Sequence, residues 1–151
     1  MARIEPKQVE HAEDQGDFQT FQIRPQLLKS GKQVTQLAGN DILKGTVMVA
    51  DSGGETVVHA HQAMDQLFVV LAGEATFYRS LDEVVAVLRP MEGVLVPRGT
   101  TYWYEKTSPE NLVLFRAAST APNVEHDSPR FSEQLRPFVE PTALDGKFFG
   151  E

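Results

Sequence analysis

The sequence contains no cysteine, and this absence removes several kinds of chemistry. Disulfide bonds, thiolate nucleophiles and thiolate metal ligands are all excluded. The chain also lacks an apolar run long enough to cross a bilayer, and no charged-then-apolar leader opens it. These absences are typical of a soluble domain in a reducing compartment. We therefore expect a cytoplasmic protein with no membrane partner.

Positive charge is scarce as well. The 14 lysines and arginines are outnumbered by 21 aspartates and glutamates, which gives a formal net charge of −7. Such a charge opposes binding to phosphate backbones, so we expect no nucleic-acid partner. The sequence shows neither a glycine-rich phosphate loop nor a Gly-x-Ser-x-Gly nucleophile motif, and no carboxylate pair stands out. The histidines are the residues on which a functional hypothesis can rest.

The pattern of turns and β-prone segments predicts an all-β fold. A chain of 151 residues with 41% hydrophobic residues is long enough for one domain with a sizeable core. Glycine and proline turns recur roughly every 8–12 residues, and no helical period is present before residue 120. We expect strands over 18–23, 33–37, 42–50, 66–71, 74–79, 84–88, 94–96, 100–105 and 112–117. This series indicates a β-sandwich or barrel.

We expect three parts in the chain: an N-terminal arm over 1–17, a barrel over 18–118 and a C-terminal extension over 119–151. Four of the nine prolines lie in the extension, so only short elements are expected there, such as a helix beginning at Ser128 and Pro129. The apolar end of the extension should pack on the barrel or on a partner subunit. Barrel edges also need covering, so we predict a homodimer. His11 and His126 are interpreted as surface residues, with His126 as an alternative extra ligand.

Two further histidines stand in a stretch rich in β-branched residues. His59 and His61 are one residue apart, and residues i and i+2 of a strand share a face about 6.6 Å apart. Residues 62–65 should turn the chain, and an antiparallel return would then place Gln66 close to His61. Two imidazoles and a side-chain oxygen make most of a mononuclear metal site. The alternative is that the histidines are simply hydrogen-bonded within the sheet.

At this point the sequence resembles the cupin superfamily, whose barrels carry two short motifs. The first motif is a glycine, five residues, His-x-His, three or four residues, a glutamate, six residues and a glycine. Gly53, His59, His61 and Gly73 match it with the correct spacing, and the glutamate position falls on Gln66.

The second motif is a glycine, five residues, Pro-x-Gly, two residues, a histidine, three residues and an asparagine. Pro97 and Gly99 match it. The opening glycine instead falls on Met91, the histidine on Tyr102 and the asparagine on Lys106. The metal-binding histidine of this motif is therefore missing.

The resemblance implies a double-stranded β-helix, or jelly-roll barrel, with a site inside it. In the family, the two histidines, the glutamate and the second-motif histidine bind a divalent metal. Here it implies His59, His61 and Gln66 as ligands of Fe, Zn, Ni or Mn. Glutamine removes one negative charge from the site, so the metal should be held more weakly than in relatives with all four ligands.

Two functions follow from the resemblance. The first is a metal-dependent enzyme acting on a small organic molecule, similar to dioxygenases, isomerases or cyclases, with Tyr102 as proton donor or fourth ligand. The second is a non-catalytic module that has lost or weakened its metal and binds a small molecule in a pocket lined by Phe68, Tyr102 and Tyr104. Tyr102 and Tyr104 should face inward and Trp103 outward, because they alternate along a strand.

Overall fold

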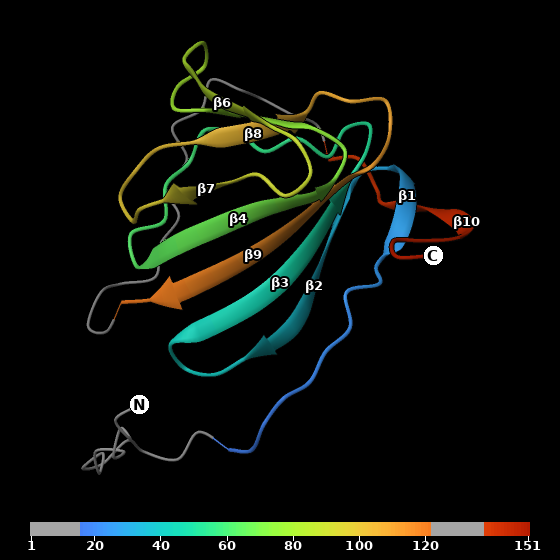
Figure 1. Cartoon of the computed structure of the whole chain (residues 1–151). Helices are drawn as coiled ribbons and strands as arrows, with labels where there is room; N and C mark the ends of the chain where they lie inside the picture. Colours follow the sequence, from blue (N-terminus) through green and yellow to red (C-terminus); the bar gives the residue numbers. More distant parts are fainter. Residues whose placement is uncertain (1–15, 122–137) are drawn as a thin grey trace, which may run out of the picture.

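The computed structural model describes residues 16–121 and 138–151, and within them every regular element is a β-strand (Figure 1). The strands are β1 (Gln26–Ser30), β2 (Lys32–Gly39), β3 (Leu43–Ala50), β4 (Met64–Ala72), β5 (Ala75–Tyr78), β6 (Val84–Leu88), β7 (Gly93–Val96), β8 (Trp103–Lys106), β9 (Leu112–Thr120) and β10 (Thr142–Phe148).

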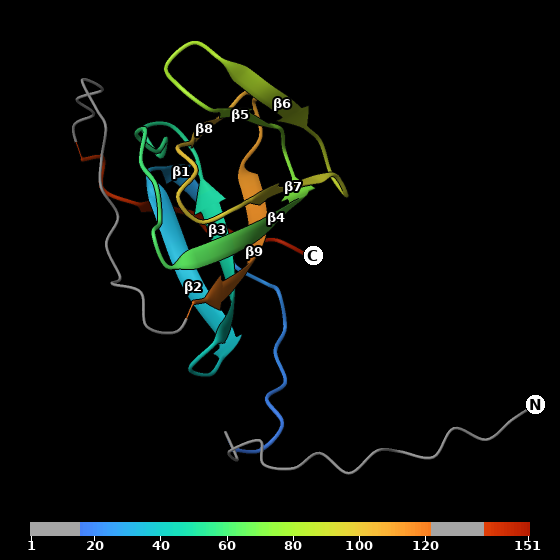
Figure 2. The same ribbon diagram turned by 90° about the vertical axis from the view of Figure 1, so that its left-hand side faces the viewer.

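Two antiparallel sheets face each other to form the barrel. One has five strands in the order β2-β3-β9-β4-β7, and the other has three in the order β6-β5-β8. Figures 1 and 2 show the three-stranded sheet lying across one face of the larger sheet. The architecture is the double-stranded β-helix, or jelly roll, so the predicted all-β fold is confirmed.

The core lies between the sheets because side chains alternate along each strand. In β9, Leu112 and Leu114 point into the barrel and belong to the main core cluster, whereas Val113 packs into a second cluster on the other face. The inward positions of the facing sheet add aromatic rings, among them Phe77 and Tyr104. This packed interior is the floor beneath the candidate site.

The second cluster joins a two-stranded ribbon to the barrel. β1 pairs with β10, and Leu28 of β1 packs with Val47 and Val49 on the outer face of the five-stranded sheet. Phe149, just beyond β10, packs against the same cluster. The sequence did not predict β10, because its partner strand lies far away in the chain.

The segment 18–23 is not a strand, contrary to expectation. Phe18 is 98% exposed, and no ladder joins this segment to a sheet. The side-chain amide of Gln19 instead binds the backbone of Gly39, donating from Nε2 to the carbonyl oxygen and accepting from the amide N–H, each at 2.9 Å. One side chain thus pairs with the edge of β2 as a peptide group would.

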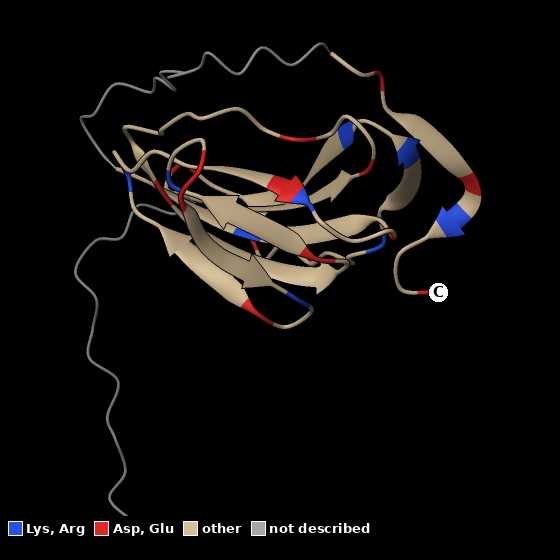
Figure 3. Ribbon diagram, turned by 90° about the horizontal axis from the view of Figure 1, so that it is seen from above, with Lys and Arg blue, Asp and Glu red and all other residues tan. Residues whose placement is uncertain are grey.

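Charged residues are distributed over strands and loops alike, as Figure 3 shows. No described helix could cross a membrane. Residues 1–15 and 122–137 are outside the described part, and so are His11, His126 and the helix predicted to begin at Ser128 and Pro129.

Candidate functional site

His59 and His61 lie in the connection between β3 and β4, and not on a continuous strand as expected. His59 forms a single antiparallel bridge with Tyr102, in which the two residues exchange backbone hydrogen bonds of 3.0 and 2.9 Å. The carbonyl oxygen of His61 accepts a hydrogen bond of 2.8 Å from Gly99 N–H. The loop that carries the histidines is therefore fixed to the segment that carries Tyr102.

The bridge brings three rings together. The centroids of His59 and His61 are 5.0 Å apart, and Tyr102 lies 4.4 Å from His59 and 6.2 Å from His61. Nδ1 of His59 is 2.6 Å from the carbonyl oxygen of Val57. Because a carbonyl oxygen only accepts, the proton of this imidazole sits on Nδ1. The ring orientation of His59 is thus set by its own loop.

Gln66 lies on β4 and contacts this cluster through Tyr102, and not through His61 as the sequence predicted. Its neighbours across the ladders are Val96 and Ala118, and not His61. Its Nε2 donates to the hydroxyl oxygen of Tyr102 at 3.1 Å. Gln66 is 1% exposed and Tyr102 is 5% exposed. A buried amide and a buried phenol therefore satisfy each other, which removes the cost of burying either group alone.

Arg116 completes the cluster, and the sequence analysis missed it. It occupies the inward phase of β9, between Leu114 and Ala118, and is half-buried. Nη1 donates to Gln66 Oε1 at 3.2 Å, and Nε donates to the hydroxyl of Thr46 at 3.2 Å. The sequence signal that could have identified it is a charged residue where strict alternation requires an apolar one.

The surroundings of Arg116 keep His61 and Tyr102 neutral near pH 7. Burial, and to a lesser extent the nearby His59 and the Arg116 guanidinium, together lower the pKa of His61 to about 4. Burial raises the pKa of the Tyr102 phenol to about 12, although the Gln66 hydrogen bond and Arg116 act in the opposite direction. Arg116 is thus a fixed positive charge among uncharged partners.

The aromatic residues predicted to line a pocket form a packed floor. Phe68 is 0% exposed and Tyr104 is 2% exposed, and their ring centroids lie 6.1 Å apart. Tyr102 and Tyr104 face the core as expected. Trp103 faces the opposite way and is nevertheless buried, because its ring stacks on Tyr78 with centroids 4.1 Å apart.

The donor set does not fit a tightly held divalent metal ion. Both ends of the Gln66 amide are engaged. Nε2 donates to Tyr102, and Oε1 accepts from the Tyr102 hydroxyl at 3.4 Å and from the Arg116 guanidinium, which would repel a dication. Within residues 16–121 and 138–151, no group of three or more His, Cys, Asp or Glu side chains could hold a metal. A divalent metal ion is held more tightly as the number of ligands and their negative charge rise, and the described part of this site offers two neutral imidazoles and no carboxylate. The roles predicted for His59, His61 and Gln66 as ligands and for Tyr102 as proton donor stay predictions.

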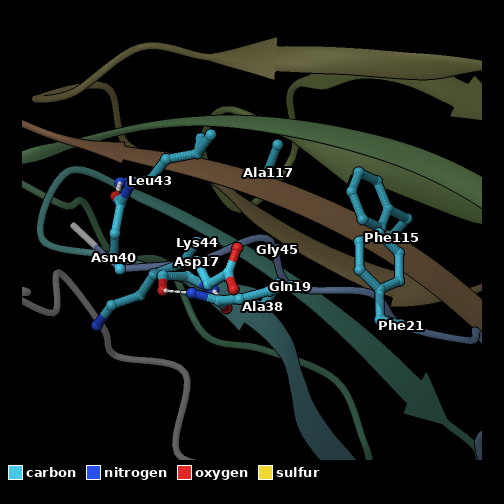
Figure 4. A pocket seen from close by; sticks show the side chains of 12 residues that line it. Asp17, Gln19, Phe21, Ala38, Asn40, Leu43, Lys44, Gly45, Phe115 and Ala117 are labelled. Carbon is cyan, nitrogen blue, oxygen red and sulfur yellow. Dashed lines mark hydrogen bonds between the residues drawn. The ribbon is translucent and has the colours of Figure 1, made fainter. Parts of the chain in front are cut away.

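Two hollows lie outside the barrel in the described part of the chain, and none of the predicted site residues lines either of them. One, of about 370 Å³, lies on the outer face of the five-stranded sheet between residues 16–21 and the strands. Figure 4 shows Phe21 and Phe115 at one end of it and Asn40 at the other. The second, of about 530 Å³, lies against the β1–β10 ribbon near Asn111. Both are apart from the histidine cluster.

Comparison with known proteins agrees with the architecture. A family model described as a Cupin domain matches residues 45–117. KdgF from Halomonas sp. is 20% identical, with a TM-score of 0.54 over 62% of this chain and 82% of that chain. No curated protein matches the sequence.

Two further solved structures are similar. An uncharacterised conserved protein with a double-stranded β-helix domain from Klebsiella pneumoniae is 17% identical, with a TM-score of 0.56 over 68% of this chain and 82% of that chain. A recombinant oxalate oxidase in complex with glycolate is 20% identical, with a TM-score of 0.52 over 64% of this chain and 55% of that chain. At these identities the likeness shows the fold alone.

Proposed function

Given that this chain belongs to the cupin superfamily, we propose that it is a small-molecule-binding protein whose barrel site works without a tightly held metal ion. The site is the cluster of His59, His61, Gln66, Tyr102 and Arg116. Metal binding through the two histidines is common in the family that the sequence resembles. In this chain the departures from the two motifs change the chemistry of the site.

The observation that carries the proposal is the hydrogen bond from Arg116 Nη1 to Gln66 Oε1 at 3.2 Å. The side-chain oxygen at the motif's glutamate position therefore accepts a hydrogen bond from a guanidinium. A positive charge fixed at that oxygen opposes the arrival of a second positive charge. The missing second-motif histidine, replaced by Tyr102, acts in the same direction because it lowers the number of ligands.

The cluster instead provides hydrogen-bonding groups, of which some are buried and others are partly exposed to solvent. Gln66 and Tyr102 are buried and orient each other, whereas His59, His61 and Arg116 are partly exposed. A few fixed polar groups above an apolar floor are typical of small-molecule recognition. A ligand would contact the partly exposed groups first, and the buried pair would hold their positions.

A second candidate function is the metal-dependent enzyme, and the close approach of the two imidazoles favours it. Their ring centroids lie 5.0 Å apart. His59, His61 and Gln66 would then hold the metal, with Tyr102 as the proton donor. A bound metal of this kind supplies Lewis acidity, or oxygen chemistry when it is redox-active.

Metal content separates the two candidates. Elemental mass spectrometry would be run on tag-free protein purified without chelator, with His59→Ala/His61→Ala beside it. We expect no stoichiometric transition metal in either protein, and no change in the thermal midpoint when a chelator is added. About one equivalent of metal in the wild type and none in the double variant would overturn the proposal.

A further inference from the structure

We infer that the ligand of this site is a small organic carboxylate, held by the guanidinium of Arg116. The inference rests on the proposed function, since it names the class of ligand for the same site.

Arg116 is a cation on the inner face of a barrel sheet, and no residue in the described part of the chain forms an ion pair with it. The ion pairs found among the described residues are formed by other arginines and by Lys106, and none includes Arg116. Its direct neighbours across the ladders are Thr46 on β3 and Phe68 on β4, and both are uncharged. Half-buried charges are usually paired, because partial loss of water raises the cost of an isolated ion. Counted over residues 16–121 and 138–151, the site therefore lacks one negative charge.

The guanidinium is also oriented in advance. Nε donates to Thr46 and Nη1 donates to Gln66, so two of its three nitrogens are already directed by neutral acceptors. Nη2 has no hydrogen-bond partner among the described residues, and Nη1 carries a second hydrogen. These two nitrogens form the edge of the guanidinium that fits the two oxygens of a carboxylate. An arginine held in place loses less entropy when it binds an anion.

The remaining neighbours favour a small ligand. Tyr102 and Phe68 are buried and pack together in the interior beside Gln66, with ring centroids 5.9 Å apart. A bound molecule is therefore restricted to the level of the imidazoles and Arg116. An arginine fork can bind two oxygens of a carboxylate or of a phosphate. A carboxylate supplies the single negative charge that the described part of the site lacks, and the titration with inorganic phosphate separates the two anions.

The test compares an acid with its neutral isostere on the full chain. Lactate and lactamide, and benzoate and benzamide, would be titrated into ¹⁵N-labelled protein while the Arg116 Nε–H resonance and the backbone amides of residues 59–66 are followed. We expect lactate or benzoate to shift these signals with millimolar affinity. The matched amide should bind at least about tenfold more weakly, since a charge-assisted hydrogen bond is lost.

Three variants separate the guanidinium from charge in general. Arg116→Gln should lower carboxylate affinity at least about tenfold, Arg116→Lys should keep part of it, and Arg98→Gln, which removes an exposed arginine bound to Asp65, should leave it unchanged. Circular dichroism would establish that each variant is folded. If Arg116→Gln is unfolded, the Arg116→Lys affinity and the acid–amide comparison decide.

The outcomes are distinct from those of the metal experiment. Equal affinity for acid and amide, unchanged affinity in Arg116→Gln, or preference for inorganic phosphate over every carboxylate would overturn the carboxylate inference in a metal-free protein. The carboxylate inference would also be overturned if no carboxylate bound in the millimolar range. A carboxylate that binds only while a metal is present would instead show that the proposed function itself is wrong.

Discussion

The side chains of Arg116 and Gln66 are joined by a hydrogen bond of 3.2 Å from Nη1 to Oε1. The pair links a strand-borne cation to the position at which the first cupin motif has a glutamate. A glutamate there would form an ion pair with the arginine and cancel its charge. Glutamine keeps the contact and leaves the charge available.

Gln66→Glu should therefore abolish the binding of carboxylates. The new carboxylate would pair with Arg116 in a site screened from water, and a ligand would have to compete with it. We expect at least about a tenfold loss of affinity for lactate or benzoate in the same NMR titration. Gln33→Glu is the matched control, because it makes the same change of charge on an exposed residue of β2. An equal loss in both variants would indicate a general effect of charge.

His61 should titrate well below an ordinary histidine. Its pKa is lowered to about 4 by burial and then by His59 and Arg116. Between that value and 6.5, the usual histidine pKa, the unfolded chain binds more protons than the folded one, so stability falls as the pH drops through this window. A ¹H–¹³C NMR titration of the imidazole, assigned with His61→Gln, measures the pKa. A value at or above 6.5 would contradict the expectation.

Tyr102→Phe and Tyr104→Phe form a matched pair of hydroxyl deletions. The Tyr102 hydroxyl accepts from the buried amide of Gln66, whereas the Tyr104 hydroxyl donates to the weakly accepting sulfur of Met48 at 3.3 Å. We expect Tyr102→Phe to lower the free energy of unfolding by about 1–2 kcal/mol and Tyr104→Phe by less than half of that. Urea unfolding with the fitted slope held constant measures both. Equal losses would mean that the Gln66 contact contributes nothing specific.

Met91→Gly should stabilise the fold. Met91 has a positive φ of 71°, the only such non-glycine residue among those described, and it stands where the second motif has its glycine. A left-handed conformation costs an L-residue about 1–2 kcal/mol, and the added freedom of glycine when unfolded offsets part of the gain. Because the side chain is 82% exposed, little packing is lost. We expect a net gain of about 0.5–1 kcal/mol by urea unfolding, and none for Met91→Ala.

The homodimer stays a prediction, and the outer face of the five-stranded sheet is where we expect it. Leu67 and Leu95 are cross-strand neighbours there, exposed by 47% and 57%, in one row with Ala117. Leu95→Glu should reduce the light-scattering mass from twice 16.8 kDa to the mass of one chain. Val87→Glu, on the other sheet, should not change it. A wild type that is monomeric at all concentrations would remove the prediction.

The sequence was sufficient for the fold but only partly for the site. Alternating apolar residues and glycine turns located the strands from β3 to β9, because strand periodicity is a local property. The same reasoning predicted a strand at 18–23, where Gln19 pairs with the edge of β2 by its side chain alone. Local patterns do not distinguish a true strand from an extended segment held in this way.

Within the site, spacing identified the two histidines and Gln66, although not how they are connected. The expected link was a ladder contact between His61 and Gln66, whereas the structure joins Gln66 to the histidine loop through Tyr102, 36 residues further along the chain. Arg116 was overlooked because the family motifs end before it. Its inward direction becomes plain only when the register of β9 against β3 and β4 is known.

The ribbon of β1 and β10 has a consequence for the order in which the molecule assembles. The Gln26 side chain donates to the carbonyl oxygen of Lys147, 121 positions away, at 2.8 Å. Closing so long a loop is entropically expensive until the intervening chain has become compact. The barrel should therefore fold before the ribbon forms, and the ribbon should open before the barrel unfolds. In a hydrogen-exchange experiment, the backbone amides of β3 and β9 should therefore exchange most slowly, and those of β10 should exchange early.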